Sequence, residues 1–142
     1  MNSESAPVVR VSRHYDFPAE RVFDGWLDPA IAGKWLFAID TGQMVRCEID
    51  ARVGGRFNFT DRRDGEDIEH VGEYLEIDRP RRLVFTFAVP KFSELYTRVT
   101  IDIVPQGAGC ELTLTHEGVL PDYLERTTAG WMKLLEKLSK CI

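Results

Sequence analysis

The stretch that decides the fold is the C-terminal segment PDYLERTTAGWMKLLEKLSKCI, residues 121–142. Its mainly apolar positions recur at steps of three and four residues, which is the period of one face of an α-helix. These positions are Leu124, Thr127, Trp131, Leu134, Leu135, Leu138 and Ile142. Pro121 suits the first helical position, and Asp122 places an anion near the positive end of the helix. The segment therefore predicts one amphipathic helix about 30 Å long, whose apolar stripe must be buried against the rest of the chain.

Most of the chain before this helix shows the alternating pattern of β-strands. Strands are predicted over residues 8–15, 44–50, 55–61, 69–77, 83–89, 97–104 and 110–116. Two short helices are predicted after the first strand, one that starts at Pro18 and breaks at Asp28-Pro29, and one over residues 30–35. Asp64-Gly65 predicts a tight hairpin turn, and short turns between strands predict an antiparallel meander. The fold class is thus α+β, with a seven-stranded antiparallel sheet packed on a long C-terminal helix.

Length and composition predict one domain spanning residues 1–142, with a flexible N-terminus at residues 1–7. The net charge is −5 and basic residues are interspersed with acidic ones, so no nucleic-acid partner is expected. The cysteines are scattered and have no metal-ligand spacing, which favours a reducing cytoplasm; they are Cys47, Cys110 and Cys141. No signal peptide and no membrane-spanning stretch is expected.

Several short motifs occur in an order that resembles a known family. They are Phe17–Phe23, Trp26-Leu27-Asp28-Pro29 followed by Trp35, Val53–Phe57, Gly72–Ile77 with Phe85-Thr86-Phe87, Leu112–His116 and Gly130-Trp131. Together they resemble the START-like (SRPBCC) superfamily, and within it the branch named after the activator of the heat-shock protein 90 ATPase. The resemblance covers residues 8–142. It implies a helix-grip fold, in which a curved antiparallel sheet wraps around the C-terminal helix.

The chain holds more aromatic residues than core packing alone requires, so several of them must either meet in the core, which is favoured for any single one, or line a ligand cavity between sheet and helix. The candidate ligand-binding residues are Trp35, Phe57, Phe59, Tyr74, Phe85, Phe87, Phe92, His116, Tyr123, Thr127 and Trp131. The irregular stretch 90–96 is expected to be a mobile loop over the cavity mouth. Gly130, beside Trp131, is expected to let the sheet and the helix approach closely.

His116 is the most informative titratable group, because it shares a strand face with Leu112 and Leu114 and should point toward the long helix. It either contacts a ligand near neutral pH or bonds to backbone or to Glu117. His14 and His70 are expected to face solvent, so no metal site is predicted.

Two further residues are weighed as catalytic candidates beside His116. Glu73 and Glu76 fall on opposite faces of one strand, so one of them should point inward or lie at an edge. Which face of the strand over residues 69–77 points into the cavity stays open. Arg13 lies on the nominal inward face and could pair with the inward carboxylate or hold an anion.

Three functions remain open on this basis. The first is a module that binds a small hydrophobic, aromatic or lipid-like ligand. The second, implied by the resemblance, is a co-chaperone-like domain of the stress response whose partner is a heat-shock protein 90 type chaperone. The third is a cyclase- or hydrolase-type enzyme that uses His116, Glu73, Arg13 or Tyr74, although no catalytic motif is present. No organic cofactor is predicted, and the chain is a monomer or a homodimer.

Overall fold

The computed structural model of the chain describes residues 8–39 and 41–142. The N-terminus predicted to be flexible, residues 1–7, lies outside the described residues. The strands are β1 (Val8–Tyr15), β2 (Gln43–Ile49), β3 (Arg56–Arg63), β4 (Glu66–Asp78), β5 (Arg82–Phe87), β6 (Thr97–Gln106) and β7 (Gly109–Glu117). The helices are α1 (Ala19–Leu27), α2 (Pro29–Trp35), the 3-10 turn η1 (Pro121–Tyr123) and α3 (Leu124–Cys141).

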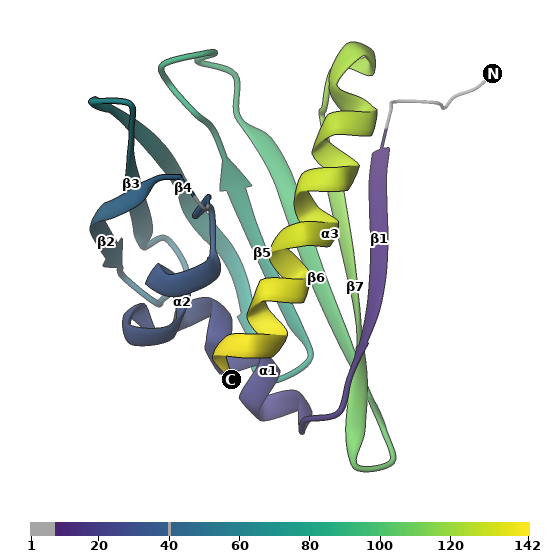
Figure 1. Ribbon diagram of the computed structural model, residues 1–142. Helices are drawn as coiled ribbons and strands as arrows, with labels where there is room; N and C mark the ends of the chain where they lie inside the picture. The colour runs from purple at the N-terminus through teal and green to yellow at the C-terminus, as the bar shows by residue number, and fades with distance from the viewer. Residues whose placement is uncertain (1–7, 40) are drawn as a thin grey trace, which may run out of the picture.

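The strands of this described part form one antiparallel sheet in the order β1-β7-β6-β5-β4-β3-β2. Strands β2 to β7 are a meander, and β1 closes the far edge by pairing with β7. This arrangement confirms the α+β helix-grip fold, with two short helices between β1 and β2 and the long helix at the C-terminus (Figure 1).

Element boundaries differ from the prediction mainly at the β3–β4 hairpin and at the start of the long helix. Asp64 and Gly65 have φ values of 52° and 80°, the left-handed pair of a type I′ turn. This turn lets the two strands pair up to Arg63 and Glu66, so β4 begins three residues before the predicted Glu69. Pro121 opens a 3-10 turn instead of the α-helix itself, which begins at Leu124.

The sheet curls along β4, the strand that changes partners. Its residues 66–73 pair with β3, and from Tyr74 onward it pairs with β5 across a bulge between Tyr74 and Glu76. A Cβ on Gly72 would collide with the Thr86 carbonyl oxygen and the Phe57 ring, so only glycine fits this bend. Glycine and bulge together give the sheet the concavity that holds α3.

Helix α3 lies across the concave face, while α1 and α2 cover one end of the sheet (Figure 1). The predicted stripe is the face that packs, since Trp131, Leu135 and Leu138 are buried. The buried Tyr15 hydroxyl donates a 2.7 Å hydrogen bond to the Leu135 carbonyl, which ties β1 to the middle of the helix.

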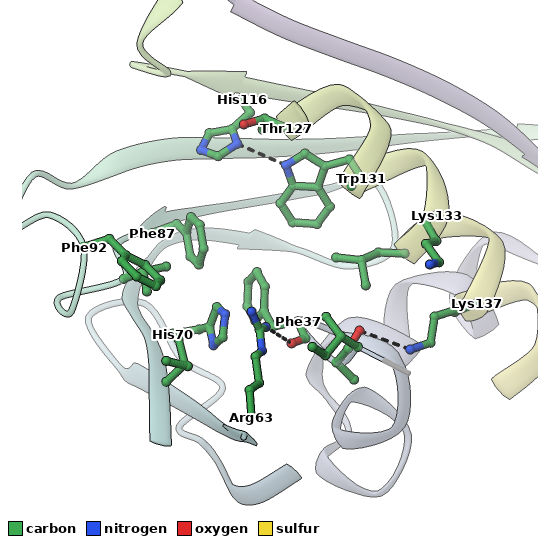
Figure 2. Close-up of a pocket in the computed structure, with 16 residues that line it drawn as sticks. Phe37, Arg63, His70, Phe87, Phe92, His116, Thr127, Trp131, Lys133 and Lys137 are labelled. Carbon is green, nitrogen blue, oxygen red and sulfur yellow. Dashed lines mark hydrogen bonds between the residues drawn. The ribbon is translucent and has the colours of Figure 1, made fainter. Parts of the chain in front are cut away.

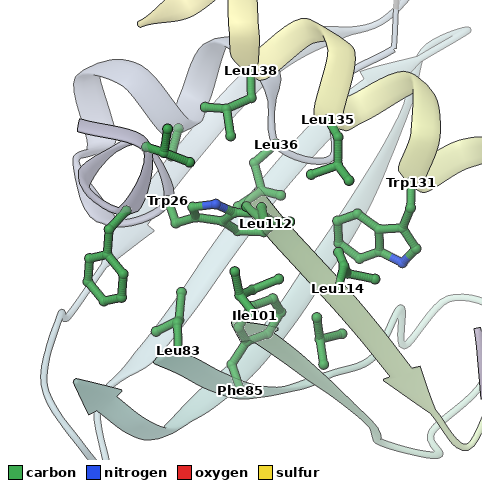
Figure 3. Close-up of a cluster of buried hydrophobic side chains, with 14 of the residues drawn as sticks. Trp26, Leu36, Leu83, Phe85, Ile101, Leu112, Leu114, Trp131, Leu135 and Leu138 are labelled. Atoms are coloured by element: carbon green, nitrogen blue, oxygen red, sulfur yellow. The ribbon is translucent and has the colours of Figure 1, made fainter. Parts of the chain in front are cut away.

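The core is densely packed at the end of the sheet next to α1 and α2 (Figure 3). Trp26 and Trp35 meet edge to face with ring centroids 4.7 Å apart, and Trp35 Nε1 donates to the Gly25 carbonyl at 3.0 Å. The cavity between Trp26 and the sheet has a volume of only about 10 Å³. The hollow that could hold a ligand therefore lies toward the other end of α3.

Candidate functional site

A pocket of about 340 Å³ opens between α3, the segment after α2, and strands β3 to β5 (Figure 2). Its walls are mostly apolar and aromatic, with a few polar groups among them. The lining residues are Phe37, Ala38, Ile39, Arg63, Ile68, His70, Phe87, Val89, Phe92, His116, Thr127, Gly130, Trp131, Lys133, Leu134 and Lys137. This composition and size are those of small-molecule sites.

The structure brings only part of the predicted ligand-binding set into this pocket. The lining includes Phe87, Phe92, His116, Thr127 and Trp131. Four other candidates are buried in the core around the small void described above; they are Phe57, Phe59, Tyr74 and Phe85.

Two candidates lie away from both spaces. Trp35 is fully buried against α1 and α2, where it fills the core. Tyr123 is 47% exposed, and the Arg126 guanidinium lies 5.5 Å from its ring centroid. Prediction by residue type could not separate these roles, because an aromatic side chain suits a core and a pocket equally.

His116 is held by a relay of hydrogen bonds that fixes its tautomer. The Trp131 indole, which can only donate, gives its Nε1–H to His116 Nδ1 at 3.0 Å. Nε2 therefore carries the proton of the neutral ring and donates to Thr97 Oγ1 at 2.7 Å, and the Thr97 hydroxyl donates to the Phe87 carbonyl at 3.0 Å. The partners are thus Trp131 and Thr97, and neither Glu117 nor backbone bonds the ring directly.

Burial lowers the pKa of His116 from 6.5 to about 4, so the ring is neutral at physiological pH. Both ring nitrogens already have partners, which leaves the ring no unpaired nitrogen with which to exchange a proton with a ligand. The arrangement instead fixes the Trp131 indole as a wall of the pocket. In Figure 2 the two side chains meet across the gap between β7 and α3.

His70 is buried, which corrects the prediction that it faces solvent. It pairs in register with Phe59 on β3, and its Nδ1 donates to the Phe59 carbonyl at 3.1 Å. Burial lowers the pKa of His70 below its ordinary value, although the bond to the Phe59 carbonyl opposes this change. The neutral ring stacks on Phe37, with centroids 5.0 Å apart and planes 7° from parallel.

Phe37 adopts a backbone conformation that is rare for an aromatic residue, with φ at 59°. Its ring also stacks on Phe87 at 4.8 Å between centroids, and it contacts Trp131 edge to face at 5.9 Å. These contacts compensate a local strain of about 1–3 kcal/mol, and such strain gathers at binding sites. Phe37 is therefore the aromatic residue around which the pocket wall is built.

Arg63 reaches inward from the end of β3 and lines the pocket with a side chain that is 30% exposed. Its Nε donates to Asp61 Oδ2 at 2.6 Å, and its Nη2 lies 3.5 Å from the Phe37 carbonyl oxygen. The Asp61 side chain is 1% exposed, and its Oδ1 has no hydrogen-bond partner among the residues described. A buried carboxylate thus supports the guanidinium from behind.

The α3 side of the pocket mouth carries Lys133 and Lys137, one helical turn apart, and Lys137 donates to the Ala38 carbonyl at 3.1 Å (Figure 2). Between Thr127 and these lysines lies Gly130. A Cβ built on Gly130 meets nothing within 4 Å, which corrects the prediction that this glycine permits close packing of helix and sheet. Its effect is to leave the mouth open.

The three catalytic candidates do not come together. Glu73 lies on the outer face of the sheet beside Arg56 and Thr86, as alternation with the buried Tyr74 requires, and the bulge after Tyr74 turns Glu76 outward as well. Glu76 forms an exposed ion pair with Arg82 at 3.3 Å, so of the alternatives predicted for these carboxylates the inward position is not the one found.

Arg13 does share the inward face of β1, but it lies in a groove beside Met132 and Glu136 of α3, apart from the pocket. Its guanidinium is 5.7 Å from the Tyr15 ring centroid, and its buried Nε has no hydrogen-bond partner within residues 8–39 and 41–142. Neither Arg13 nor Glu73 lines the pocket that contains His116.

Sequence reasoning missed Phe37, Arg63, His70 and the two lysines. Extending the inward alternation of Phe57 and Phe59 by four residues reaches Arg63, and the antiparallel register opposite Phe59 reaches His70. Phe37 follows a helix in an irregular segment, so no periodic signal could have placed it.

Within the described residues, no group of three or more His, Cys, Asp and Glu side chains is arranged to hold a metal ion. Among the helices of the same described part, none has the length and apolarity needed to span a membrane.

A curved seven-stranded antiparallel sheet that grips its C-terminal helix defines the START-like class of the helix-grip fold, and a pocket between sheet and helix fits that class. Residues 16–142 match the family described as activator of Hsp90 ATPase homolog 1-like protein. The chain belongs to this family.

Solved structures of bacterial proteins share the fold over nearly their whole length. Protein CV1439 from Chromobacterium violaceum is 28% identical with a TM-score of 0.85, covering 94% of each chain. Protein NE0264 from Nitrosomonas europaea is 21% identical with a TM-score of 0.82, covering 99% of this chain and 97% of that one. An AHSA1-like protein from Aeromonas hydrophila is 19% identical with a TM-score of 0.82, covering 94% and 90%. A comparison with curated proteins gave no match.

Proposed function

We propose that the chain binds a small hydrophobic or aromatic molecule in the pocket between the sheet and α3. The observation that carries this proposal is the open, mostly apolar hollow of about 340 Å³ in a fold whose opposite end is densely packed. The family supports a ligand-binding or co-chaperone-like domain in general terms.

The pocket walls support a preformed site. Trp131 is fixed by His116, while Phe37 is fixed by stacking on His70 and Phe87. A ligand therefore meets rings that have already lost their conformational freedom, which lowers the entropic cost of binding. The three free cysteines of the described chain accord with the reducing cytoplasm in which we place this function.

Occupation of the pocket can be tested with the neutral fluorophore N-phenyl-1-naphthylamine. We expect its emission to rise on addition of the protein, and Gly130→Leu to weaken its binding at least about tenfold, because the new side chain extends into the open mouth. Ala129→Leu is the matched control, since Ala129 is exposed on the same helical turn and does not line the pocket. Absence of binding, or equal binding to both variants, would rule out this site.

The second candidate is a co-chaperone-like interaction with a heat-shock protein 90 type chaperone. The family description favours it, as do the exposed side chains of Phe92, Leu95 and Tyr96, which are 71%, 69% and 59% accessible. Co-purification of the host chaperone with the wild-type chain, but not with a Leu95→Ser/Tyr96→Ser variant, is the expected result. Equal recovery with both would exclude this loop as the contact.

Catalysis through His116, Glu73 and Arg13 is not proposed. The three side chains lie in separate places, and both nitrogens of His116 already have partners.

A further inference from the structure

The charged groups of the pocket point to a more specific ligand class. Arg63, Lys133 and Lys137 all line it, and none of its lining residues in the described chain is Asp or Glu.

The position of Arg63 is the strongest part of this argument. A guanidinium has five N–H donors, and the contacts of Arg63 to Asp61 and to the Phe37 carbonyl engage two of them. Its side chain is 30% exposed, so its planar head is partly withdrawn from water where it borders the hollow. A charged donor in such a setting binds carboxylates strongly and with defined geometry.

Asp61 keeps the guanidinium in this position when the pocket is empty. Its Oδ2 accepts from Nε, while its Oδ1 is buried without a partner among the residues described. An unpaired carboxylate oxygen in the interior is costly, so the pair serves a purpose other than stability alone. It holds an arginine in the lining of a mostly apolar pocket.

The remaining polar groups of the pocket do not compete for this role. His70 and His116 are neutral rings whose Nδ1 atoms are bonded to Phe59 and Trp131 respectively. The lysines come from α3, and Lys137 contacts the Ala38 carbonyl beside the Phe37 carbonyl that Arg63 approaches (Figure 2). The apolar rings that line the same pocket can accept the body of a ligand whose head is anionic.

We propose that the ligand is an amphipathic organic acid, whose apolar or aromatic body lies against Phe37, Phe87 and Trp131 and whose carboxylate is bound by Arg63. This inference rests on the proposed binding function and adds the chemistry of the head group.

The test compares 2-naphthoic acid with the neutral 2-naphthamide by calorimetric titration of the full chain at neutral pH. We expect the acid to bind at least about tenfold more tightly than the amide, the range that a charge-assisted hydrogen bond supplies. Equal affinities would overturn the proposal that the ligand has an anionic head group, while leaving the proposed binding function intact. Binding of neither compound, together with no response of N-phenyl-1-naphthylamine, would remove both proposals.

Variants at the ion pair separate recognition from a structural role. Arg63→Met alone leaves Asp61 buried without its partner and endangers folding, so the informative variant is Arg63→Met/Asp61→Asn. We expect it to bind the two naphthalene compounds equally. Asp61→Asn alone should tighten binding of the acid and leave the amide unchanged, because Arg63 no longer shares its charge. Weaker acid binding in Asp61→Asn would contradict the assignment.

Matched surface variants complete the design. Arg62→Met removes a charge from the same strand on its outer face, where Arg62 pairs with Asp67, and should leave the preference for the acid within about twofold of wild type. Lys137→Met at the mouth should reduce that preference, whereas Lys140→Met, on the same helix but outside the pocket lining, should not. If Arg62→Met lost as much of the preference for the acid over the amide as the double variant does, the preference would reflect net charge and not binding by Arg63.

Discussion

At the scale of single residues, His116 shows how one side chain can be interpreted in two ways from sequence. A histidine on an inward strand face suits a proton donor or a structural partner. The structure gives it the Trp131 indole on one nitrogen and the Thr97 hydroxyl on the other, so it acts as a positioning residue for the pocket wall.

This role predicts a dependence of stability on pH. The unfolded chain takes up a proton on His116 near pH 6.5, whereas burial holds its folded pKa at about 4. The unfolded state therefore binds more protons between these values, and the free energy of unfolding falls as the pH falls. The loss should be on the order of 2 kcal/mol between pH 7 and pH 4.5, and His70 adds to it in the same direction.

Urea unfolding at the two pH values measures this effect. His116→Gln removes the titrating ring with a side chain of similar length, so its stability should fall less between the two pH values than that of the wild type. An identical pH dependence in the two proteins would show that His116 does not carry the effect.

At the scale of elements, the alternation of side chains was enough to predict every strand and the packed face of α3. Alternation could not reveal where the regular pairing of the strands is interrupted. The bulge between Tyr74 and Glu76 turns Glu76 to the same outer face as Glu73, whereas strict alternation would place the two carboxylates on opposite faces. The inward position of His70 becomes visible only once the β3–β4 register is fixed by the turn at Asp64-Gly65.

The bend of β4 can be tested at Gly72. A methyl group there would collide with the Thr86 carbonyl oxygen, a backbone atom that cannot turn aside, and with the Phe57 ring. Gly72→Ala should therefore destabilise the fold by about 1–3 kcal/mol, the usual cost of overpacking.

Chemical denaturation of Gly72→Ala beside Gly130→Ala provides the contrast. The second substitution places a methyl group in open space on a helix, where alanine is favoured over glycine by up to about 1 kcal/mol. A Gly72→Ala protein as stable as the wild type would mean that the sheet does not need glycine to curve here.

At the scale of the whole molecule, packing is divided between the two ends of α3. The end beside α1 and α2 is filled by Trp26, Trp35 and the leucines of the helix. The other end opens beneath the segment that follows β5, where Val89 and Phe92 line the pocket. The irregular sequence of residues 90–96 predicted that this segment lies at the mouth. That the segment is mobile stays a prediction.

Phe92 tests the part that this segment plays. Its side chain is 71% exposed and lines the pocket, so Phe92→Ala should speed release of a bound aromatic ligand while changing the free energy of unfolding by less than about 0.5 kcal/mol. Stopped-flow displacement of N-phenyl-1-naphthylamine measures the release rate. Leu95 is similarly exposed but does not line the pocket, so Leu95→Ala should release the probe at the wild-type rate. Equal release rates in the wild type and both variants would show that Phe92 does not control the mouth of the pocket.

The most direct test of the central claim is a nuclear magnetic resonance titration that follows the indole N–H signals. Trp131 lines the pocket and donates to His116, whereas Trp35 is buried in the core and donates to Gly25. Addition of 2-naphthamide, which needs no anionic head group, should shift the Trp131 signal progressively to saturation and leave the Trp35 signal in place. A Trp131 signal that does not move, or moves only together with that of Trp35, would contradict a ligand site between the sheet and α3.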